Sequence, residues 1–94
     1  VPPLVSSVVP MSAASDAGLR EGDVIRTVNG TPIVRFDQLK DIVEASEGAP
    51  LALGVWRDGA MLDVTLTPRK VDEPQADNSF VTTYRIGVAS GMPS

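Results

Sequence analysis

Residues 12–25 read SAASDAGLREGDVI, and Asn29-Gly30 follows after three further residues. Ser12 can cap a helix, the alanines after it favour one, and Gly18 can adopt the left-handed conformation that ends a helix. The alternation over residues 23–28 is typical of a strand, and Asn-Gly is a strong turn signal because both residues tolerate positive φ. This stretch therefore predicts a short helix, a tight turn, a strand and a second turn.

Patterns on either side complete the predicted architecture. Apolar residues at Phe36, Leu39, Ile42 and Val43 have helical spacing, and Asp58-Gly59 marks a hairpin turn. The remaining predicted elements are a proline-bounded strand over 4–9, a short strand over 31–34, a helix over 36–46, hairpin strands over 51–57 and 61–67, a polar loop over 69–83 and a final strand over 84–88. This order predicts an α+β fold, a compact antiparallel β-sheet or partial barrel capped by one short and one long helix.

Composition excludes several classes of function. The formal net charge of −4 and the scattered basic residues argue against nucleic-acid binding. The chain has no cysteine and no histidine, which excludes disulfides and removes the commonest general base and metal ligand. We predict no catalytic residue and no metal site; Asp72, Glu73 and Asp77 are interpreted as solvated surface.

Length and hydropathy define the expected unit. At 94 residues the chain is expected to form one domain over 1–94. It is expected to be soluble, because no apolar run approaches the ~20 residues needed to span a bilayer, and we expect a monomer. The chain opens at Val1 without a start methionine and ends in Gly-Met-Pro-Ser. We interpret it as a piece of a longer protein.

The stretch over 12–30 resembles the signature of bacterial PDZ domains, roughly S-x-A-x-x-A-G-L-x-x-G-D-x-I followed by x-x-x-(N/D)-G. The physics agrees with a structural role for these residues. Ala14 and Ala17 are small enough for the short helix to lie close to the sheet, and Asp23 can accept hydrogen bonds from loop amides. We interpret the signature as specifying the fold, without contacting a ligand.

The resemblance implies that an extended peptide binds as an added strand, between a sheet edge and the long helix. In the family, a loop that usually reads like Gly-Leu-Gly-Phe holds the peptide carboxylate through backbone amides. The best match here is the run 84–88, in which Gly87 permits close approach and Ile86 and Val88 line an apolar pocket. An equally weighted alternative is that this run is only a last core strand.

On the long helix, the resemblance places Phe36 at the first groove-facing position and Lys40 one turn later. Phe36 has an alternative role as a staple at the helix start. Many PDZ domains carry His at the position of Phe36. Because this chain has no His there, the resemblance favours an apolar ligand. The predicted peptide-binding residues are Tyr84, Arg85, Ile86, Gly87, Val88, Phe36 and Lys40, and the expected partner is a protein or peptide C-terminus or an extended segment.

The late position of the Ile-Gly run indicates a circularly permuted PDZ domain. Together with the opening Val-Pro-Pro-Leu-Val-Ser-Ser-Val-Val-Pro, it is similar to the PDZ domains of site-2 proteases, membrane-embedded zinc metalloproteases of the regulator of sigma-E type. The resemblance implies a longer parent at the periplasmic face of the inner membrane, with this domain controlling substrate access for regulated intramembrane proteolysis. Its zinc ligands would lie outside this chain, which has no histidine. The alternatives are a PDZ domain of a periplasmic serine protease and a non-catalytic scaffold or secretion module.

Overall fold

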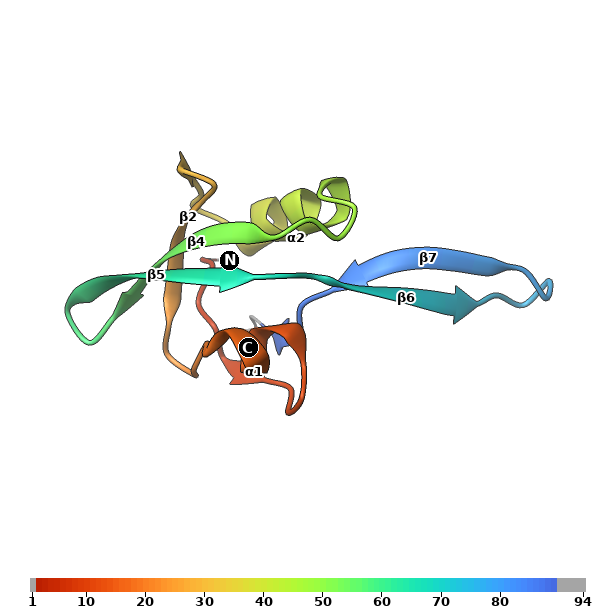
Figure 1. Ribbon diagram of the computed structural model, residues 1–94, viewed down its shortest axis with the longest axis horizontal. Helices are drawn as coiled ribbons and strands as arrows, with labels where there is room; N and C mark the ends of the chain where they lie inside the picture. The colour runs from red at the N-terminus through yellow and green to blue at the C-terminus, as the bar shows by residue number, and fades with distance from the viewer. Residues whose placement is uncertain (1, 90–94) are drawn as a thin grey trace.

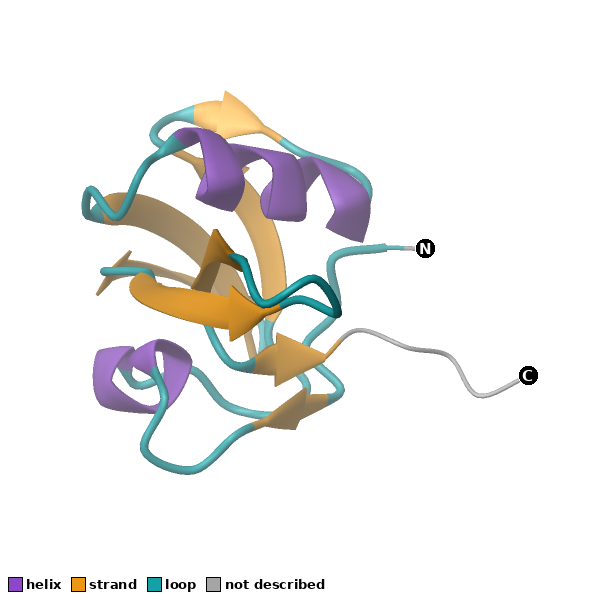
Figure 2. Cartoon of the chain, turned by 90° about the vertical axis from the view of Figure 1, so that its right-hand side faces the viewer, coloured by secondary structure: helices purple, strands orange, loops and turns teal. Residues whose placement is uncertain are grey.

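The computed structural model describes residues 2–89, so the predicted domain 1–94 extends beyond the described residues at both ends. Its helices lie on opposite sides of the strands (Figure 2), and the predicted α+β class is confirmed. In chain order the elements are β1 (Ser7–Val8), α1 (Ala13–Ala17), β2 (Val24–Val28), β3 (Thr31–Pro32), α2 (Phe36–Ala45), β4 (Leu51–Arg57), β5 (Ala60–Leu66), β6 (Arg69–Pro74), β7 (Phe80–Arg85) and β8 (Val88–Ala89).

The central sheet is antiparallel, with spatial order β3-β2-β4-β5. Strand alternation explains its buried face, because Leu51, Leu53 and Val55 point to the same side and are each at most 2% exposed. Side chains from both helices and from the N-terminal segment belong to the same buried cluster as these three residues. The buried apolar residues are Val5, Ala13, Ala14, Leu19, Ile25, Val28, Ile33, Leu39, Val43, Leu51, Leu53, Val55, Leu66 and Ile86.

Local signals set the ends of α1 as predicted. Ser12 is its N-cap and accepts a hydrogen bond from the Ser15 amide at 3.1 Å, and Gly18 ends it at φ +91°. In α2, Leu39 and Val43 are buried, as the helical spacing predicts. Both helices are therefore fixed to the sheet by side chains that the sequence pattern identifies.

A buried ion pair ties the turn before β2 to the end of β4. Asp23 is 1% exposed, and Arg57 Nε and Nη2 donate to its two carboxylate oxygens at 2.8 and 2.7 Å. Arg57 also donates to the Gly18 carbonyl, and the Arg20 amide donates to Asp23 at 2.9 Å. The predicted hydrogen bond from a loop amide to Asp23 is confirmed, whereas the two hydrogen bonds from the Arg57 guanidinium were not predicted. These hydrogen bonds from Arg57 lower the pKa of Asp23 below its ordinary value.

The prediction of a polar loop over 69–83 is wrong, because this segment forms most of a two-stranded hairpin. Strands β6 and β7 pair in register from Arg69 opposite Arg85 to Pro74 opposite Phe80. The hairpin projects away from the central sheet (Figure 1). A projecting hairpin is largely solvated on both faces, so it lacks the apolar alternation that identifies a half-buried strand.

The predicted final strand over 84–88 is interrupted. Strand β7 ends at Arg85, and β8 begins at Val88 and pairs with β1 through Val88 opposite Val8. The first strand is also shorter than the predicted 4–9, with an isolated bridge from Leu4 to Val24 before it. The predicted circular permutation stays a prediction.

Candidate functional site

The break between β7 and β8 is held in a fixed conformation by the start of α1. The Ala14 amide donates to the Ile86 carbonyl, and the Val9 amide donates to the Gly87 carbonyl, both at 2.7 Å. Gly87 has φ +85°, and a Cβ placed there would lie 2.2 Å from the Cβ of Ser12. Glycine is required at this position for both reasons.

The amides of Ile86 and Gly87 have no acceptor within the residues that the structure describes. Within residues 2–89, neither N–H donates to a backbone or side-chain oxygen, although both carbonyls are used. Backbone donors in folded proteins almost always have a partner. These two neighbouring amides are therefore available to water or to an oxygen atom of a ligand.

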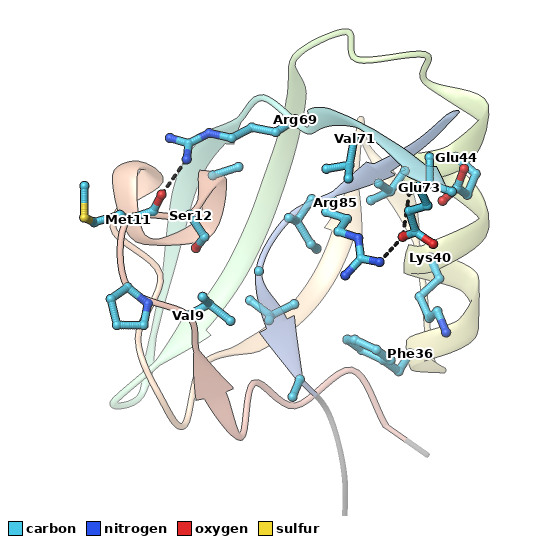
Figure 3. Close-up of a pocket in the computed structure, with 18 of the residues that line it drawn as sticks. Val9, Met11, Ser12, Phe36, Lys40, Glu44, Arg69, Val71, Glu73 and Arg85 are labelled. Carbon is cyan, nitrogen blue, oxygen red and sulfur yellow. Dashed lines mark hydrogen bonds and ion pairs between the residues drawn. The ribbon is translucent and has the colours of Figure 1, made fainter. Parts of the chain in front are cut away.

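A groove of about 780 Å³ lies over this segment and against α2 (Figure 3). In the part of the chain that the structure describes, β8 pairs with β1 alone, so its other edge has no strand beside it. The groove brings together Phe36, Lys40, Val43 and Glu44 of α2, residues 85–89, the connection from Val9 to Ala13, and Val71, Glu73 and Thr83 of the hairpin.

Six of the seven predicted site residues line this groove: Phe36, Lys40, Arg85, Ile86, Gly87 and Val88. Tyr84 does not. Side chains alternate along β7, so Tyr84 is on the hairpin face opposite to that of Arg85, and its ring lies close to Gly48.

The structure gives two of the predicted residues a double role. Phe36 is half-buried and packs against the core, and it also lines the groove. Ile86 is a core residue at 8% exposure, and it too lines the groove. The core and groove interpretations of these two residues are therefore compatible.

The hairpin contribution to the groove was not predicted. Val71, Glu73 and Thr83 share one face of β6 and β7, and Thr83 Oγ1 donates to Glu73 at 3.4 Å. Glu73 also forms an ion pair with Arg85 across this face (Figure 3). Positions 69, 71 and 73 are Arg, Val and Glu, so no apolar alternation in the sequence identifies this face.

Within residues 2–89, no group of three Asp, Glu, His or Cys side chains could hold a metal ion. In the same range, no helix has the length and apolar character needed to cross a membrane. The groove combines apolar side chains, a strand edge and paired charges, which suits non-covalent recognition of a polypeptide.

Comparisons with known proteins agree with this geometry. A family model described as "PDZ domain" matches residues 4–57. Among solved structures, the PDZ domain of an SdrC-like protein from Listeria monocytogenes superposes with a TM-score of 0.70 at 17% identity, covering 90% of this chain and 82% of that one. At that identity, the likeness shows the fold.

Curated relatives are bacterial proteases. The chain is 40% identical over 82% of its length to the periplasmic serine endoprotease DegP of Escherichia coli, and 43% identical over 72% to the regulator of sigma-E protease RseP of Salmonella typhimurium. It is 28% identical over 96% to a putative zinc metalloprotease of Rhizobium meliloti. It spans only 16%, 15% and 24% of these relatives, respectively.

Proposed function

The chain belongs to the PDZ domain family, and from that membership we propose that its groove binds an extended polypeptide segment as an added β-strand. The observation that carries the proposal is the edge of β8 that pairs with no strand within residues 2–89. It follows directly after two amides that have no acceptor in that range, and it lines the same groove as α2. In this mode of binding, main-chain hydrogen bonds supply affinity and pockets for alternate side chains supply specificity.

Each groove residue then has a distinct role. The Ile86 and Gly87 amides donate to a ligand oxygen, and Val88 contributes its backbone edge. Phe36 offers an apolar contact, while the aliphatic stem of Lys40 covers the ligand and its ammonium group stays in water. Tyr84, on the other face of the hairpin, supports the site without touching the ligand.

Titration of the isotope-labelled domain with short apolar peptides tests this proposal by NMR. We expect shifts concentrated at Phe36, Lys40 and residues 86–88, with dissociation constants of about 1 μM or weaker, which corresponds to roughly −8 kcal/mol at best. Replacing Phe36 with alanine should weaken binding about tenfold through the lost apolar contact.

The matched control is Val34→Ala, because Val34 is 70% exposed just before the same helix and does not line the groove. It should bind like the original domain. Absence of any shift at millimolar peptide would contradict peptide binding and favour a scaffold module or a steric filter.

We further propose that the chain is a regulatory domain of a membrane-embedded zinc metalloprotease of the site-2 type. Its similarity to RseP and to the Rhizobium zinc metalloprotease supports this parent. The domain would lie at the periplasmic face of the inner membrane and control which substrates reach intramembrane proteolysis. Because this chain has no histidine, a zinc-binding motif would lie elsewhere in the parent.

A soluble serine protease is the second candidate parent, favoured by the 40% identity to DegP over 82% of the chain. The two parents differ outside this domain. An H-E-x-x-H helix flanked by membrane spans in the full-length protein, with zinc in the purified enzyme, would establish the metalloprotease. A chymotrypsin-like domain upstream would establish the serine protease.

A further inference from the structure

The groove does not end at Gly87. Its lining continues onto Val71, Glu73 and Thr83 of the hairpin. Val71 lies directly opposite Thr83 in the β6–β7 register, so their side chains stand on one face. A bound chain that reached Gly87 would therefore find a second surface beyond it, which we call the hairpin wall (Val71, Glu73 and Thr83).

Charges at this end of the groove do not favour a terminal carboxylate. Arg85, next to the free amides, is paired with Glu73 (Figure 3). Arg69 is paired with Asp16 and also donates to the Met11 carbonyl. Three acidic and three basic side chains line the groove, so their formal charges cancel: Asp41, Glu44 and Glu73 against Lys40, Arg69 and Arg85.

The Arg85–Glu73 pair can open at little cost. The two side chains are 63% and 35% exposed, and exposed ion pairs contribute little to stability. A ligand backbone can displace the Glu73 and Arg85 side chains from the hairpin wall. A ligand carboxylate, in contrast, would compete with Glu73 for Arg85 and would be repelled by the negative charge of Glu73.

We propose that this groove recognises an extended segment within a polypeptide, whose chain continues past Gly87 along the hairpin wall, in preference to a free C-terminus. The inference rests on the proposed peptide-binding function and specifies its substrate class. The free amides at Ile86 and Gly87 then donate to peptide carbonyls, which need no neighbouring cation.

The test is an array of short apolar segments of varied sequence, each made as a free acid, as a C-terminal amide, and with a Gly-Ser-Thr-Gly extension. We expect the extended form to bind most tightly and the free acid ~5-fold more weakly, because the carboxylate meets Glu73. Glu73→Gln should strengthen binding of the free acid more than binding of the amide, so the difference between the two forms should shrink.

Two tryptophan substitutions separate the hairpin wall from general effects on the hairpin. Thr83→Trp should block the wall and remove the advantage of the extended form. Thr82→Trp is the matched control, because Thr82 also donates to a β6 carboxylate, that of Asp72, but on the opposite face. Folding of both variants is checked by NMR dispersion.

The outcomes separate this inference from the function on which it rests. If the free acid binds most tightly and amidation abolishes binding, the preference for internal segments is wrong and the peptide-binding function stands. If no form binds at millimolar concentration, the peptide-binding function itself fails.

Discussion

Replacing Gly87 with alanine is expected to abolish peptide binding. The Cβ would lie 2.2 Å from the Cβ of Ser12 and 2.4 Å from its Oγ, in a residue whose φ is +85°. The start of α1 and the chain at Gly87 cannot both keep their positions. We therefore expect the amides of residues 86 and 87 to be displaced from the groove. The strained φ and the clash together should cost about 2–4 kcal/mol of unfolding free energy.

Urea unfolding followed by the fluorescence of Trp56, the single tryptophan, measures the stability, and NMR titration measures the binding. Gly59→Ala is the control, because Gly59 has a similar φ of +83° but no atom within 4 Å of the added Cβ. That variant should lose about 1–2 kcal/mol through strain and bind peptide normally. A Gly87→Ala domain that binds like the original would show that the ligand does not use this segment.

The sequence predicted the parts of the fold that local patterns determine. The α1 signal is complete within residues 12–18, where a cap, small helix formers and a C-terminal glycine are adjacent. The spacing of Leu39 and Val43 also identified the buried face of α2 without reference to any other element. In both helices the residue pattern and the tertiary contacts require the same conformation.

The hairpin could not be predicted in the same way. Its strands pair with each other, and much of their surface meets solvent, so polar residues such as Asp72 and Glu73 occupy strand positions. A loop has no regular alternation of side chains, so the prediction of a loop over 69–83 gave no reason to place Tyr84 and Arg85 on opposite faces. For this reason the predicted site included Tyr84 and omitted Val71, Glu73 and Thr83.

Arg57 illustrates a different limit. It is 34 residues from Asp23 in sequence, and nothing in either local pattern joins them. Only the antiparallel pairing of β2 with β4, which places Val24 opposite Trp56, brings the guanidinium to the carboxylate. The signature aspartate therefore has a long-range partner as well as the loop amide that the sequence indicated.

Replacing Asp23 with asparagine is expected to destabilise the domain by about 1–3 kcal/mol, because it leaves the partly buried Arg57 without its counter-ion. The variant should also lose part of the acid sensitivity of the domain. In the folded state, hydrogen bonds from Arg57 hold the pKa of Asp23 below its ordinary value of 3.8. The ionised carboxylate therefore stabilises the fold fully above that value, and this contribution is lost as the pH falls through the lowered pKa.

Urea unfolding at several pH values between neutral and strongly acidic measures both effects. Below pH 3.8, the ordinary pKa of an aspartate, the unfolding free energy of the original domain should decline more steeply with falling pH than that of Asp23→Asn. The control is Asp37→Asn, since Asp37 pairs with Arg35 where both side chains are more than half exposed, at 67% and 59%. Its loss of stability at neutral pH should be far smaller than that of Asp23→Asn, about 1 kcal/mol or less for an exposed pair in the first turn of α2. Equal acid slopes for the original domain and Asp23→Asn would show that Asp23 keeps an ordinary pKa, and therefore that its pairing with Arg57 does not stabilise the fold.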